Sequence, residues 1–68
     1  SGLMIDADKL AYYRERYSSK YYIALGYKSS ADGSLEYSMY MLTQWVLEIA
    51  REHDMTYDEV FNLLKDAV

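Results

Sequence analysis

The 68-residue sequence predicts an all-α fold, a single small three-helix bundle, on three observations. Hydrophobic residues make up 51% of the chain and recur at helical spacing. No proline interrupts the predicted helices. The one clear loop is the glycine- and serine-rich stretch 26–34. We therefore expect one domain over 1–68, with helices at about 7–26, 35–53 and 57–67.

The first helix has a start signal at Asp6, whose carboxylate can accept a hydrogen bond from the first turn. Ile5 and Leu10 flank this cap at the spacing of a hydrophobic staple. An apolar stripe then follows one side of the helix as far as Gly26, a residue typical of helix ends. The stripe consists of Leu10, Tyr13, Tyr17, Tyr21, Ala24 and Leu25.

Residues 20–28 leave a second interpretation open. Tyr21, Ile23, Leu25 and Tyr27 alternate with smaller or polar residues as they would in a strand, after a Ser-Ser pair that weakens a helix. The minority alternative is therefore an α+β fold with a short strand or hairpin at this place.

The second helix is expected to start at Ser34, a good N-cap residue with Glu36 in the turn that follows. Its apolar stripe keeps helical spacing to the end of the segment. The stripe consists of Leu35, Met39, Leu42, Val46, Ile49, Ala50 and His53.

The third helix has the firmest local signal. Thr56 and Glu59 form a capping box, in which each side chain bonds to the backbone N–H of the other residue. Met55 and Val60 stand at the staple positions on either side. The predicted buried stripe consists of Val60, Leu63, Leu64 and Ala67.

The composition argues against several classes of protein. Without cysteine and with one histidine, the chain has neither disulfides nor a Cys/His zinc site, and we expect no cofactor. Apolar runs are only a few residues long, which argues against a membrane span or a signal peptide, so we expect a cytoplasmic protein. Residues 1–3, Ser-Gly-Leu before Met4, resemble a remnant of a cloning vector.

The sequence contains few residues that could act in catalysis. His53 is the one candidate base, and its place at the end of a helix, on the apolar stripe, indicates a capping or rim histidine. The acidic residues around it follow no metal-ligand spacing, and Asp58 and Glu59 are explained by the start of the third helix. We expect no enzyme and no metal site.

Charge is divided unevenly along the chain. Residues 1–30 carry five Lys or Arg against three Asp or Glu, and residues 31–68 carry two against eight. Such a division can steer self-association or orient a charged partner. The third helix, which follows a tight turn as in a helix-turn-helix, is too acidic to approach DNA phosphates, so we do not expect nucleic-acid binding there.

Aromatic, apolar and cationic side chains gather away from the predicted core. Tyr and Arg are enriched at protein-binding hot spots, and Met adapts to irregular surfaces. These residues predict a small protein-interaction module, of the regulator or inhibitor type, that binds a protein partner. Self-association is a second predicted interaction. The predicted partner-binding residues are Tyr12, Arg16, Lys20, Ile23 and Tyr27 on the first helix and Tyr37, Tyr40 and Met41 on the second.

Three alternatives stay open. The acidic second half could mimic nucleic acid and inhibit a DNA- or RNA-binding protein, or the first helix could bind single strands by stacking. The surplus face of the second helix could also be covered within the bundle by the first helix. Under that last interpretation, as under partner binding, Tyr37 and Met41 are buried against something.

Overall fold

The computed structural model describes residues 5–68, so the predicted vector remnant 1–3 lies outside the described part. Three α-helices follow one another and confirm the all-α three-helix bundle. They are α1 (Ala7–Leu25), α2 (Ser34–Glu52) and α3 (Tyr57–Leu64), with a final 3-10 turn, η1 (Lys65–Ala67).

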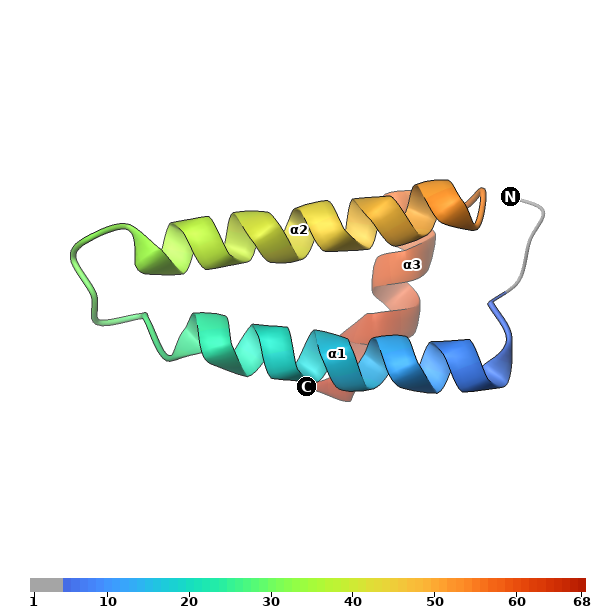
Figure 1. Ribbon diagram of the computed structural model, residues 1–68, viewed down its shortest axis with the longest axis horizontal. Helices are drawn as coiled ribbons and strands as arrows, with labels where there is room; N and C mark the ends of the chain where they lie inside the picture. Colours follow the sequence, from blue (N-terminus) through green and yellow to red (C-terminus); the bar gives the residue numbers. More distant parts are fainter. Residues whose placement is uncertain (1–4) are drawn as a thin grey trace.

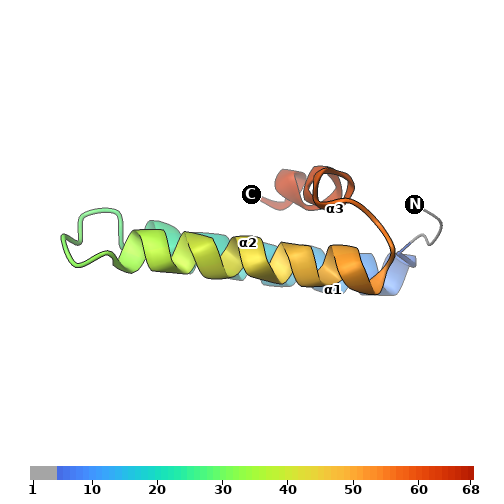
Figure 2. The same ribbon diagram turned by 90° about the horizontal axis from the view of Figure 1, so that it is seen from above.

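The two long helices form an antiparallel hairpin, and α3 lies across one of its faces. Figure 1 looks onto the hairpin with α3 behind it, near the end where α2 runs into α3. In Figure 2, turned by 90°, α3 covers only this end, and the opposite face of the hairpin carries no helix. The molecule is elongated, with extents of 42, 18 and 14 Å.

The start of α1 is the predicted one. The Asp6 carboxylate accepts a hydrogen bond from the backbone N–H of Lys9 at 2.9 Å. Ile5 is buried and belongs to the core cluster, and Leu10 packs against that cluster. The staple and the cap therefore fix the helix start together.

The strand alternative at 20–28 is wrong, because α1 continues to Leu25 and no strand occurs in residues 5–68. Ala24 is fully buried, which ties this last stretch of α1 to the rest of the fold. A lone strand would leave its backbone groups unpaired, whereas in α1 the helix supplies their partners. The chain leaves the helix through Gly26, whose N–H donates to Tyr22 and Ile23 carbonyl oxygens.

The predicted N-cap at Ser34 is also wrong, since Ser34 is already the first residue of α2. The side chain that acts here is Asp32, which accepts hydrogen bonds from both the backbone N–H and the hydroxyl of Ser34. A carboxylate is the stronger acceptor, and these bonds lower the pKa of Asp32. Gly33 between them adopts φ 83°, a left-handed conformation that favours glycine.

The turn from α2 into α3 is fixed by backbone and side-chain bonds. The Met55 N–H donates to the Ala50 carbonyl oxygen at 2.8 Å, which closes the end of α2 while Asp54 adopts φ 54°. The capping box is confirmed: the Glu59 N–H donates to the Thr56 hydroxyl oxygen and the Thr56 N–H to the Glu59 carboxylate. The two helices are therefore joined by a short, well-bonded corner.

The core lies where all three helices meet. Val46, Val60 and Leu64 are its most completely buried large side chains. Partly buried hydrophobic residues, half of them from α3 and η1, pack against it from outside. The whole core cluster consists of Ile5, Tyr13, Tyr17, Leu42, Val46, Ile49, Ala50, Val60 and Leu64.

The predicted stripes are buried at only one end of the hairpin. Leu25 on α1 and Met39 on α2 were expected in the core, yet they are 40% and 38% exposed. The reason is that α3 has only eight residues and lies across the hairpin, so it covers a short part of two helices that each have 19. Towards the loop, the stripes have no third helix to bury them.

Candidate interaction surface

The face of the hairpin opposite α3 collects most of the predicted partner-binding residues, and we call it the open face. Lys20 and Ile23 of α1 lie beside Met41 of α2. Residues three or four apart share a helix face, so the same two rows extend along both helices towards the α3 end. The open face consists of Tyr12, Arg16, Lys20 and Ile23 from α1 and Tyr37, Met41, Trp45, Glu48 and Glu52 from α2.

A shallow hollow lies between the two rows. Its volume is about 240 Å³, and it opens to solvent between α1 and α2. The residues that line it are Lys20, Ile23, Tyr37, Ser38, Met41 and Leu42. Four of the eight predicted partner-binding residues therefore meet at one place, although they come from two segments of the sequence.

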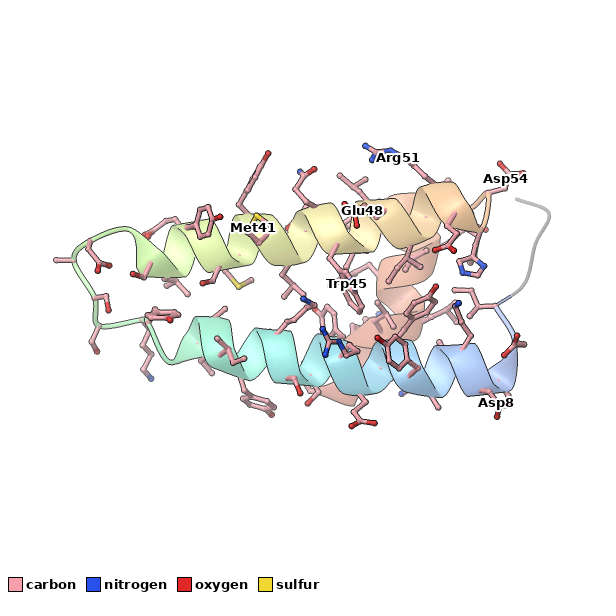
Figure 3. The ribbon with its side chains drawn as sticks, in the orientation of Figure 1. Asp8, Met41, Trp45, Glu48, Arg51 and Asp54 are labelled. Carbon is pink, nitrogen blue, oxygen red and sulfur yellow. The ribbon has the colours of Figure 1, made fainter. Side chains whose placement is uncertain are left out.

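Trp45 was missed in the sequence, and it organises the middle of this face. In Figure 3 it reaches from α2 into the space between the two long helices. The Lys20 ammonium group lies 5.4 Å from the centre of its ring, which is a cation–π contact. Lys20 is thus half-buried and already in contact with Trp45 within the chain. The signal for Trp45 was its position four residues after Met41, on the same row.

The other large side chains of the open face are exposed to solvent. Tyr37 is 66% exposed and Met41 47%, so α1 does not cover them as one interpretation had it. Ile23 is 63% exposed and Tyr12 56%. Such groups need another molecule if they are to be buried.

Two predicted residues lie at the margin of this surface. Tyr27 follows the end of α1, where its N–H donates to the Ala24 carbonyl oxygen, and its side chain is exposed. Tyr40 is exposed one turn after Tyr37 and does not line the hollow. The structure therefore brings together Lys20, Ile23, Tyr37 and Met41 more closely than these two.

His53 lies at the α3 end and is a rim residue, as predicted from its position. Its Nε2 is 3.0 Å from the Tyr13 hydroxyl, and the two rings meet edge to face at 5.7 Å. Burial raises the pKa of Tyr13, and the nearby Glu52 carboxylate raises it further. Burial likewise raises the pKa of Tyr17. These contacts link the start of α1 to the end of α2.

Charges of opposite sign face solvent on the two helices. Arg16 on α1 and Glu48 on α2 are exposed, and within residues 5–68 neither has a salt-bridge or hydrogen-bond partner. Arg51 is exposed too, but Figure 3 shows it pointing away from α1, off the open face. The open face therefore has a cationic side on α1 and an anionic side on α2.

Two further features bear on function. Over the described residues, no three histidine, aspartate or glutamate side chains converge as metal ligands would. In the same part of the chain, no helix has both the length and the apolar character needed to cross a membrane.

Comparisons with protein-family models, curated proteins and solved structures give no match to this chain. The fold defines its class as a small all-α three-helix domain, and its function has to be argued from the open face itself.

Proposed function

We propose that this chain is a protein-interaction module that binds a protein partner on the open face. The observation that carries the proposal is the row of exposed large side chains beside a hollow that is already formed. Ile23, Tyr37 and Met41 surround this hollow, and each is at least 47% exposed. Interfaces concentrate their binding energy in such aromatic and aliphatic anchors, with pockets between them.

The way the face is built supports the same function. α3 packs on the other side of the hairpin, and the exposed side chains around the hollow, Ile23, Tyr37 and Met41, are not part of the core cluster. The Lys20 contact holds Trp45 in place, which reduces the side-chain entropy lost on binding. A regulator or inhibitor without chemistry of its own needs only a preorganised surface of this kind.

Partner capture from the native host tests the proposal. The variant with Ile23, Tyr37 and Met41 all replaced by Ala should lose the captured protein, while its helical circular dichroism stays unchanged. A matched control replaces Tyr22 and Arg51 with Ala, because both are exposed and lie outside the open face. Equal capture by the open-face variant and the wild type would remove this function.

The two nucleic-acid alternatives have weaker support. Of the acidic residues on α3 and η1, Glu59 is bonded within the capping box, which leaves Asp58 and Asp66 as exposed carboxylates. On α1, Lys20 lies against Trp45 instead of being free to meet a phosphate. A gel shift with a short single-stranded oligonucleotide, repeated at two salt concentrations, would detect direct binding.

A further inference from the structure

We infer that the occupant of the open face is a second copy of this chain, in a dimer whose two-fold axis runs parallel to the long helices. In this dimer α1 of each copy lies over α2 of the other, and four long helices form one bundle. The inference rests on the proposed function of the open face and names its partner. Complementary charges and exposed apolar side chains on the open face support this dimer.

Charge complementarity selects this arrangement. Arg16 is an exposed cation on the α1 row, Glu48 is an exposed anion on the α2 row, and both lack partners in the described chain. A two-fold axis parallel to the helices keeps each residue at its own level and places α1 opposite α2. Lys20 contacts Trp45 and Tyr13 contacts His53 across the antiparallel hairpin, which puts Arg16 and Glu48 at nearly the same level. Arg16 of each copy then faces Glu48 of the other, so the pair forms twice.

The other symmetric way to join the faces is disfavoured. With the two-fold axis in the plane of the face but perpendicular to the helices, α1 lies over α1 and α2 over α2. That arrangement sets the Arg16 side of each copy against the same side of the other, and likewise for Glu48. Like charges across an interface are repulsive, and this repulsion excludes wrong pairings. The opposite charges of the two halves of the chain therefore favour one orientation.

The exposed apolar groups of the open face fit a dimer. Figure 1 looks onto this face of the hairpin. In the proposed geometry, Ile23 of one copy meets Tyr37 and Met41 of the other across their hollows. Tyr37 and Ile23, the two most exposed large hydrophobic side chains of the described residues, are thus covered.

Mixing two charge-reversal variants tests the pairing. Arg16→Glu and Glu48→Arg should each place like charges together twice and weaken dimerisation about tenfold or more. An equimolar mixture restores opposite charges at both positions, so it should form a heterodimer about as tightly as the wild type dimerises. Sedimentation equilibrium measures both. Emission from Trp45, the only tryptophan, should shift to the blue as the dimer forms.

Control variants show whether a change in dimerisation comes from the open face. Arg51→Glu and Glu15→Arg change charge equally at exposed positions off the open face, and both should dimerise like the wild type. A wild type that is monomeric at about 100 μM, or a mixture that stays monomeric, overturns the dimer. So does dimerisation that neither open-face reversal weakens, because the contact then lies elsewhere. Monomeric wild type with intact host-partner capture leaves the proposed function standing, whereas loss of both removes both.

Discussion

The two ends of the α1–α2 hairpin carry apolar stripes of the same spacing but have different surroundings. At the α3 end, Tyr13, Val46 and Ile49 belong to the buried core cluster, whereas at the loop end Leu25 and Met39 remain partly exposed. Both ends carry the same apolar stripe at the same spacing. A helical stripe thus shows which side of a helix is apolar, but the length of the neighbouring helix decides how much of that side is buried. The α3 end stabilises the fold, and the loop end and the open face are available for binding.

The largest expected difference is between truncating a core side chain and truncating a side chain of the open face. The quantity compared is the free energy of unfolding. Leu64→Ala removes a fully buried side chain and should lower the free energy of unfolding by about 2–5 kcal/mol, enough to unfold much of a domain of this size. Met41→Ala on the open face should change it by less than about 0.5 kcal/mol. Urea unfolding followed by circular dichroism, at a concentration where the chain is monomeric, gives both values. Similar losses in the two variants would refute the division of roles.

The next largest difference in stability is expected between the N-terminal ends of α3 and α2. Thr56→Ala breaks the capping box at the α3 end and should cost about 1 kcal/mol. Ser34→Ala at the loop end should cost clearly less, because the Asp32 carboxylate still accepts the bond from the backbone N–H of residue 34. The same urea experiment measures both variants. A larger loss for Ser34→Ala than for Thr56→Ala would mean that the serine is the cap after all.

The hydrogen bond between Tyr13 and His53 should contribute a similar or smaller amount. Tyr13→Phe removes the hydroxyl but keeps the ring, and should lower the free energy of unfolding by about 0.5–1.5 kcal/mol. Tyr40→Phe is the matched control, since this exposed hydroxyl has no described partner. Equal effects of the two substitutions would show that the Tyr13 contact adds nothing to stability.

The free energy of unfolding should fall at alkaline pH and should not change near neutral pH. Burial raises the pKa of both Tyr13 and Tyr17, so these groups ionise more readily in the unfolded chain. Their contribution is fully present below about pH 10, and the free energy of unfolding falls as the pH rises beyond it. Urea midpoints from about pH 8 to about pH 11 measure the decline. Tyr17→Phe should make it shallower, and an increase of stability with pH would contradict the assignment.

Local signals in the sequence predicted most of the fold. The capping box at Thr56 and the cap at Asp6 depend only on residues a few positions apart, and both were correct. The start of α2 was placed wrongly, because Asp32 and Ser34 are both good hydrogen-bonding residues and only the geometry of the loop shows which of them accepts.

The candidate site was predictable only in part, since it depends on which residues of two helices come level with each other. Lys20, Ile23, Tyr37 and Met41 were identified from composition and spacing, but their meeting around one hollow depends on the register of the hairpin. Trp45 could not be paired with Lys20 from spacing alone, because they are 25 positions apart. The exposed ends of the stripes depend on the short length of α3, which no local pattern in α1 or α2 specifies.

Methyl NMR of the methionine side chains tests the central claim most directly. Met41 lies on the open face, Met39 on the partly exposed stripe at the loop end, and Met55 beside α3 in the core. As protein concentration increases, the Met41 methyl signal should shift while those of Met39 and Met55 stay in place. Shifts of Met39 or Met55 with an unchanged Met41 signal would contradict binding on the open face.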